Sequence, residues 1–154
     1  MNILGVSCFY HDSASCLVQD GKVIAAASEE RFTRQKSSPL FPINAINFCI
    51  QKANLSVYDI DYIGFYEKPF LKFYRALLSH LRAYPMSIKN FLDTMPNWLD
   101  ERLSMPLIFK RELGYEKKVL FIHHHLSHAA SAFLASPFEE AAILTADGVG
   151  EWAT

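Results

Sequence analysis

The sequence has no apolar run that approaches the roughly 18 residues of a membrane span, which excludes a membrane-spanning protein. An excess of basic charge is also absent, because 15 Lys and Arg residues are balanced by 16 Asp and Glu residues and the net charge is −1. A chain without a basic field has little with which to hold a nucleic-acid backbone. We therefore expect neither a membrane nor a nucleic acid among its partners.

Cysteine is scarce as well. The three cysteines, Cys8, Cys16 and Cys49, are an odd number and lack the paired spacing of a metal site. Residues 1–4 contain no basic side chain of the kind that begins a secretory leader. These features predict reduced, buried thiols in a cytoplasmic protein.

The apolar residues that are present follow the pattern of a folded α/β domain. The 154 residues are 51% hydrophobic and 20% charged, which suits one compact domain and excludes a disordered chain. Asp20-Gly21 predicts a two-residue hairpin turn, because glycine readily adopts positive φ. Four prolines are expected to divide residues 69–113 into short helices. The expected strands are 3–9, 14–18, 23–28, 61–66, 118–122 and 141–146, and the other expected helices are 43–53 and 123–135.

This order of elements predicts an α/β fold, namely a ribonuclease-H-like lobe of the actin/sugar-kinase/heat-shock ATPase architecture with a mixed sheet flanked by helices. We expect the first lobe to cover residues 1–138, with a helical insertion at 69–113. Residues 139–154 are expected to begin a second, truncated lobe, because their strand leads into a glycine-rich turn with no helix after it. The chain is therefore expected to be a fragment.

Four of the six histidines lie between residues 123 and 128. If a helix begins near His123, then His124 and His128 are spaced i, i+4 and project from one face, as paired ligands do in helical metal sites. The positive end of a helix disfavours imidazolium and so favours the neutral imidazole that a metal requires. The alternative is a solvated histidine cluster in which one member caps the helix.

The turn that begins at Asp147 is the second candidate. Asp147 follows an expected strand and is available as a third metal ligand beside the two histidines, and nitrogen and oxygen ligands without thiolates fit iron, manganese or zinc. Gly148 and Gly150 would let backbone N–H groups approach an anion such as a phosphate. A plain hairpin turn is the alternative.

Two further segments carry candidates that also have plainer explanations. His11 lies between the first two expected strands, where Asp12 is placed to orient it as a polar contact or general base. An exposed turn stabilised by the Asp side chain explains the same residues. Arg31, Arg34 and Lys36 belong to a charged run that either binds an anionic group or is simply a solvated face.

Taken in order, these motifs resemble the NodU/CmcH-type carbamoyltransferases. The resemblance spans the chain, and family members are several times longer, so the chain resembles their N-terminal part. The motifs that carry it are Gly5-Val6-Ser7-Cys8-Phe9-Tyr10-His11-Asp12-Ser13-Ala14-Ser15, Glu29-Glu30-Arg31-Phe32-Thr33-Arg34-Gln35-Lys36, Phe41-Pro42, the histidine run 124–133 and Asp147-Gly148-Val149-Gly150-Glu151-Trp152.

The resemblance implies O-carbamoylation of a hydroxyl on a small-molecule acceptor. In such enzymes carbamoyl phosphate and ATP form carbamoyl-adenylate in a C-terminal domain. The carbamoyl group is then transferred in an N-terminal domain of actin/heat-shock type, related to the tRNA threonylcarbamoyl-transfer proteins. Matched by position, His124 and His128 resemble the metal-binding pair and Asp147 the carboxylate on the metal or phosphate side.

At the transfer site, His11 resembles a base that takes the acceptor proton, and Lys36 a residue that steadies carbamoyl or phosphate oxygens. The expected divalent metal is iron, with manganese or zinc as alternatives. The fragment alone is expected to be inactive, and a homodimer is a further expectation. Two other interpretations remain open: a different metal-dependent ATPase or kinase of the same architecture, and a non-catalytic binding or assembly module.

Overall fold

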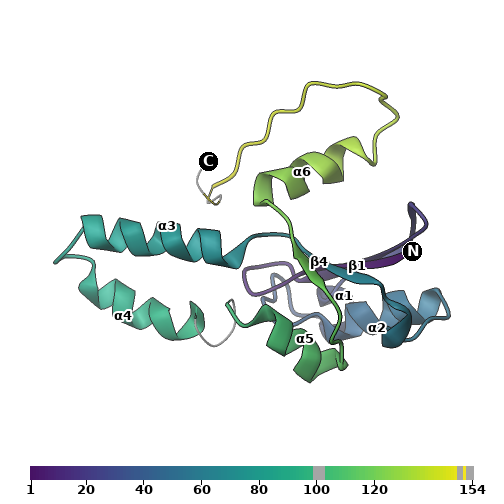
Figure 1. The fold of residues 1–154 in the computed structure, drawn as a ribbon, viewed down its shortest axis with the longest axis horizontal. Helices are drawn as coiled ribbons and strands as arrows, with labels where there is room; N and C mark the ends of the chain where they lie inside the picture. The colour runs from purple at the N-terminus through teal and green to yellow at the C-terminus, as the bar shows by residue number, and fades with distance from the viewer. Residues whose placement is uncertain (99–102, 149–150, 152–154) are drawn as a thin grey trace. The chain divides into compact units, whose positions relative to one another are not determined.

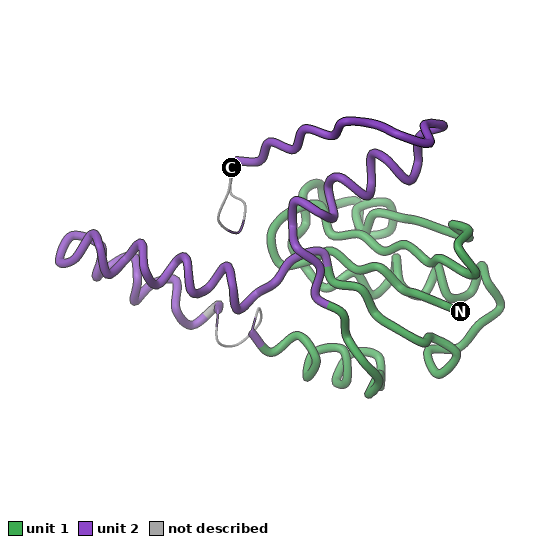
Figure 2. Tube along the Cα trace, turned by 45° about the horizontal axis from the view of Figure 1, so that its top comes forward, with its two compact units in different colours: residues 1–65, 104–120 green, residues 66–103, 121–154 purple. Residues whose placement is uncertain are grey.

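The computed structural model describes residues 1–98, 103–148 and 151, and the chain divides into two compact units (Figure 2). The first unit contains residues 1–65 and 104–120, and the second contains residues 66–103 and 121–154.

A five-stranded mixed sheet, in the order β3-β2-β1-β4-β5, organises the first unit. Figure 1 labels two of its strands, β1 and β4. β1 pairs antiparallel with β2, β2 pairs antiparallel with β3, and β4 lies parallel beside β1. Five of the expected strands are thereby confirmed. Their bounds are β1 (Asn2–Ser7), β2 (Ala14–Gln19), β3 (Lys22–Ser28), β4 (Tyr62–Phe65) and β5 (Val119–Phe121).

The hairpin between β2 and β3 turns at Asp20 and Gly21, as the sequence predicts. Both residues have positive φ, 49° and 79°. Such a turn has the twist that joins two antiparallel strands without splaying them, and it strongly favours glycine at the second position.

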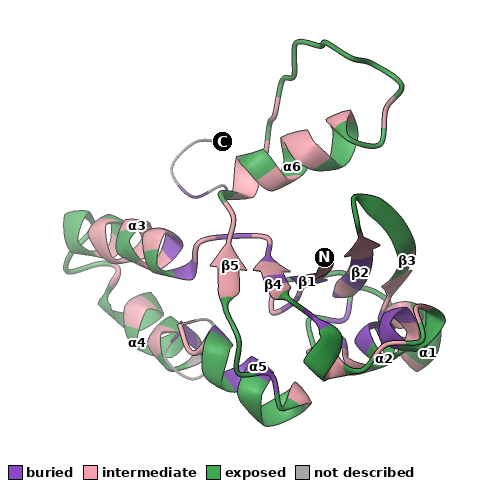
Figure 3. Ribbon diagram, turned by 45° about the vertical axis from the view of Figure 1, so that its right-hand side comes forward, coloured by how far each residue is buried: buried purple, intermediate pink, exposed green. Residues whose placement is uncertain are grey.

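One face of the sheet is buried beneath helices α2 (Ile43–Lys52) and α5 (Met105–Leu113). Strand register places the buried side chains on the same face, because Leu4 is opposite both Leu17 and Ile63. The α2 thiol of Cys49 contacts the β2 backbone, and α5 presents Phe109 edge-on to Phe65 of β4 at 6.5 Å. Figure 3 colours the buried residues of both helices purple. Gly114 ends α5 with a φ of 69°, as expected.

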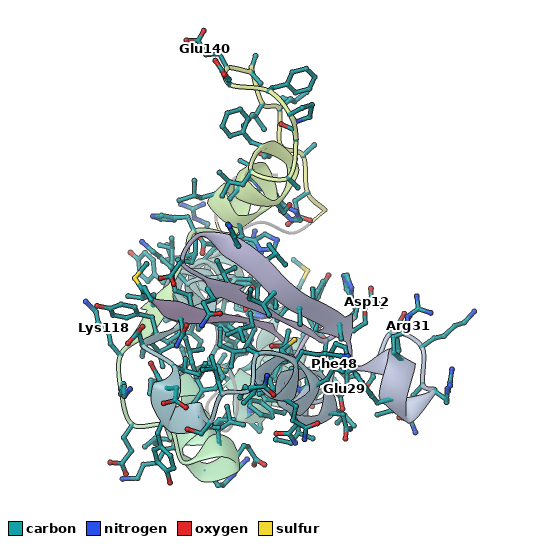
Figure 4. The ribbon with its side chains drawn as sticks, turned by 90° about the vertical axis from the view of Figure 1, so that its right-hand side faces the viewer. Asp12, Glu29, Arg31, Phe48, Lys118 and Glu140 are labelled. Carbon is teal, nitrogen blue, oxygen red and sulfur yellow. The ribbon has the colours of Figure 1, made fainter. Side chains whose placement is uncertain are left out.

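A buried carboxylate caps α2. Glu29 is 2% exposed; its Oε2 accepts the Ala45 N–H at 2.9 Å, and its Oε1 accepts the Asn44 side-chain amide at 2.6 Å and backbone N–H at 3.3 Å. The first N–H groups of a helix have no partner within the helix, and a negative charge there is favourable. Glu29 therefore has a structural role, whereas Arg31 on the following short helix α1 (Glu30–Thr33) is exposed (Figure 4).

The cysteines behave as expected of unpaired thiols. All three are free, and Cys8 and Cys49 are buried as expected, whereas Cys16 is only partly buried. Burial raises the pKa of the Cys16 and Cys49 thiols above the ordinary value, so little thiolate forms near neutral pH.

The second unit is helical in its regular parts. Its described helices are α3 (Pro69–Arg82), α4 (Ile88–Asn97) and α6 (His124–Phe133), and the first unit adds the short 3-10 helix η1 (Val57–Asp59). Among the residues that the structure describes, no helix combines the length and apolar character of a membrane span.

Prolines divide residues 69–113 much as predicted, with one exception. Pro69 begins α3 and Pro106 lies in the first turn of α5, where a missing N–H costs little. Pro96, in contrast, lies inside α4 near its end. The hydrogen bond that Pro96 cannot make is tolerated so close to the end of the helix. Trp98, just after α4, packs edge-on against Phe73 of α3, with the ring centroids 5.8 Å apart.

The strand expected at 141–146 is wrong. Residues 141–147 are described and form neither helix nor strand. A strand is stabilised by pairing with a neighbour, and the described sheet ends with β3 on one side and β5 on the other. Without a partner, the apolar residues of this segment are open to solvent, and Leu144 is 94% exposed.

We predict that Glu29→Ala destabilises the protein, because the α2 N–H groups and the Asn44 amide lose their shared acceptor inside the protein. The expected loss is about 2–3 kcal/mol of unfolding free energy, measured by chemical denaturation. Glu140→Ala removes an exposed carboxylate and serves as the control, with an expected change within about 0.5 kcal/mol. Equal stability of the two variants would contradict the capping role.

Candidate metal centre

Helix α6 begins where the histidine run begins. His123 is its N-cap, with extended backbone angles, and His124 is the first helical residue. His124 and His128 are therefore one turn apart on the same face, as the i, i+4 spacing predicts.

Three potential ligand atoms converge beside this helix. The Nε2 atoms of His124 and His128 are 3.2 Å apart, and the His124 Nε2 lies 2.8 Å from Oδ2 of Asp147. One ligand atom from each of the three residues lies within 4.8 Å of the other two. The side chains of His124 and Asp147 are partly buried, at 14% and 24% exposed. The structure thus brings together the three residues that the sequence singled out as metal ligands.

The surroundings of His124 agree only in part with a role as a metal ligand. Tyr66 packs edge-on against the His124 ring at 5.5 Å, and the Ser127 hydroxyl donates to the Tyr66 carbonyl at 3.0 Å. These contacts hold the ring with its Nε2 toward His128 and Asp147. Within the described part of the chain, the buried Nδ1 has no hydrogen-bond partner, although a metal-bound histidine usually donates from its second nitrogen.

Tyr66 is a functional candidate that the sequence did not reveal. It belongs to an aromatic stretch that is most simply interpreted as core residues. Its position directly after β4 was the available signal, because side chains that follow a strand lie at the edge of a sheet.

Of the other candidates, His11 and Lys36 lie in the first unit, and Gly148 lies in the second unit beside Asp147. The His11 Nδ1 lies 2.7 Å from Oδ2 of Asp12, so Asp12 orients the ring as the sequence suggests, and both side chains are more than half exposed. Lys36 is exposed. Gly148 is described and exposed next to Asp147, whereas Gly150 lies outside the described residues.

Comparison with known proteins supplies the family. A model described as carbamoyltransferase N-terminus matches residues 2–154. The chain belongs to this family. The resemblance of its ordered motifs to carbamoyltransferases is thereby confirmed.

Relatives in bacteria and an archaeon extend the comparison. Protein sll1178 of Synechocystis is 49% identical over 99% of this chain, and the nodulation protein NolNO of Sinorhizobium fredii is 39% identical over 95% of it. Protein MJ1051 of Methanocaldococcus jannaschii is 26% identical over 97%. The chain covers only 26%, 21% and 22% of these three proteins, so their remaining residues have no counterpart in it.

We predict that the purified, untagged chain contains iron, manganese or zinc at close to one ion per chain, measured by elemental analysis. Replacing His124 and His128 together by alanine is expected to abolish this metal, because only Asp147 of the three ligands remains.

His80→Ala is the matched control. It removes a histidine from α3, outside the cluster, and is expected to leave the metal content unchanged. Equal metal in the parent chain and in the double variant would show that the ion binds elsewhere.

Proposed function

We propose that this chain is the N-terminal part of an O-carbamoyltransferase. The enzyme would move a carbamoyl group from carbamoyl-adenylate to a hydroxyl of a small-molecule acceptor, assisted by a histidine-bound divalent metal. The observation that carries the proposal is the convergence of His124, His128 and Asp147 in a chain that matches the carbamoyltransferase N-terminus family along almost its whole length.

The topology of the first unit supports a ribonuclease-H-like lobe of actin type. An antiparallel β1-β2-β3 meander with β4 parallel beside β1 is the arrangement that such a lobe requires. In this proposal, residues beyond this chain would synthesise carbamoyl-adenylate from carbamoyl phosphate and ATP. The matched relatives are four to five times longer than the aligned region, which leaves room for such a domain.

The three ligand atoms of the candidate site suit a divalent metal that assists the transfer. Two imidazole nitrogens and one carboxylate oxygen are ligands for iron, with manganese or zinc as alternatives. A bound divalent ion would offset negative charge on phosphate or carbamoyl oxygens. His124, His128 and Asp147 would hold the ion, and the edge-on contact of Tyr66 would keep the His124 ring in its ligating orientation.

His11 would act as the base in the transfer. With Nδ1 held by Asp12, its Nε2 is the nitrogen that accepts the proton of the acceptor hydroxyl. The acceptor oxygen then forms a bond to the carbamoyl carbon, the bond from that carbon to the adenylate phosphate oxygen breaks, and AMP leaves with the electron pair. Lys36 would stabilise the negative charge that develops on the carbamoyl or phosphate oxygens during the transfer.

The full-length protein that contains this chain tests the proposal. It is expected to catalyse exchange of pyrophosphate into ATP only when carbamoyl phosphate is present, and to transfer a radiolabelled carbamoyl group to a small-molecule extract of its own cells. His11→Ala is expected to slow the transfer about 100-fold while leaving the exchange intact, because the base acts only in the second step. His80→Ala is the control for both reactions.

Two other outcomes would assign the chain differently. A rate of ATP hydrolysis that does not depend on carbamoyl phosphate would indicate another metal-dependent ATPase or kinase. Self-association without nucleotide turnover, measured by size-exclusion chromatography, would indicate a binding or assembly module. The 154-residue chain alone is expected to show no transferase activity.

A further inference from the structure

Two consecutive histidines lie beside two residues that are four positions apart in the sequence. The His124 Nε2 is 2.8 Å from Oδ2 of Asp147, and the preceding His123 places its Nδ1 2.9 Å from Oε2 of Glu151. Both pairs belong to the second unit. Asp147 is a candidate metal ligand, whereas Glu151 does not belong to the ligand group found among the described residues.

The second pair is part of a larger network around the Glu151 carboxylate. Its Oε1 accepts the backbone N–H of Lys68 at 2.7 Å, and the side chain is only 8% exposed. Lys68 is the N-cap of α3, so the carboxylate also lies at the positive end of that helix. A carboxylate buried to this extent needs such partners, because burial of an unpaired charge is costly.

The contacts of His123 also indicate which of its two ring nitrogens donates a hydrogen bond and which accepts one. A carboxylate oxygen only accepts, so the Nδ1 of His123 must carry the proton that it donates to Glu151. The Nε2 of the same ring lies 2.8 Å from the Lys68 Nζ and accepts from that ammonium group. Lys68, His123 and Glu151 therefore form a closed set of three contacts, with each donor facing an acceptor.

The contacts of Glu151 with His123 and Lys68 anchor the chain at residue 151. This anchor affects Asp147, because Asp147 lies only four residues earlier in a segment without regular structure. Residues 141–147 form neither helix nor strand, so the backbone that carries Asp147 is not part of the sheet or of a helix. A ligand on such a segment loses conformational freedom when it binds a metal, which weakens binding. Attachment of the chain four residues later restricts Asp147 before the metal arrives.

We propose that Glu151 is a positioning residue that holds Asp147 ready for metal binding through its contacts with His123 and the Lys68 backbone. The inference rests on the proposed metal site and adds a residue that supports one of its ligands without touching the ion. Partners that hydrogen-bond a metal ligand directly typically contribute a factor of 10–100 to metal affinity, so we expect an anchor that acts one step further away to contribute about a factor of 10.

Glu151→Gln is the first test. Glutamine keeps the size of the side chain but has a single acceptor oxygen, so it cannot satisfy both the His123 and the Lys68 N–H groups. We expect the Kd of the 154-residue chain for Mn²⁺, measured by electron paramagnetic resonance, to rise about 10-fold. Glu140→Gln removes an exposed carboxylate of the same unit and should leave the Kd unchanged.

Variants of His123 test whether the effect passes through this contact. His123→Ala should raise the Kd by a similar factor, and combining it with Glu151→Gln should add little, because both changes break one network. His123→Asn places an amide nitrogen near the former Nδ1 and should restore most of the affinity lost in His123→Ala. Full additivity of the two changes would overturn the proposal.

The remaining outcomes separate the anchor from the metal site itself. The Asp147→Asn variant should lose Mn²⁺ binding, because it removes a ligand of the proposed metal site. A Glu151→Gln variant that binds Mn²⁺ as tightly as the parent chain would show that Glu151 does not position Asp147. If the parent chain binds no Mn²⁺, the metal site fails and the anchor fails with it. Unfolding temperatures in EDTA complete the test, since a weaker Kd matched by a large fall in metal-free stability would indicate a general structural role and overturn the proposal.

Discussion

The candidate site depends on the residue at which α6 begins. With His124 as the first helical residue, the helix period carries His128 to the same face, and His123 remains outside the helix with its ring free to turn toward Glu151. A start one residue later would leave His124 as the cap and separate the two Nε2 atoms that now lie 3.2 Å apart. The distinct roles of three neighbouring histidines thus follow from one helix boundary.

Buried glutamates at helix N-termini recur in both units. Glu29 accepts N–H groups at the start of α2, and Glu151 accepts the N–H of the residue that caps α3. Each satisfies donors that a helix cannot satisfy itself, and each has the charge that the positive helix end favours. In the first unit this arrangement stabilises the helix that covers the sheet, and in the second it ties the chain after Asp147 to a helix.

Sequence reasoning succeeded where short-range geometry decides the outcome. The Asp20-Gly21 turn and the His124–His128 pair each require only a local backbone conformation with a known period or turn shape. It failed where distant partners decide. The expected strand at 141–146 has the right apolar residues but no described strand beside it, and Glu29 looked like part of a solvated charge run until its partners on α2 were known.

By itself the sequence determined the family, through ordered motifs, and the pairing of two histidines on one helix face, through the 3.6-residue period. The sequence also suggested Asp147 as a third ligand, and the tertiary structure brings it to His124. Tertiary structure alone decided that Tyr66 packs against the same ring and that Glu151 meets His123. These contacts join residues from 23 to 58 positions apart in the numbering. Residues so far apart are brought together only when the whole unit folds, since no local backbone preference specifies which distant side chains meet.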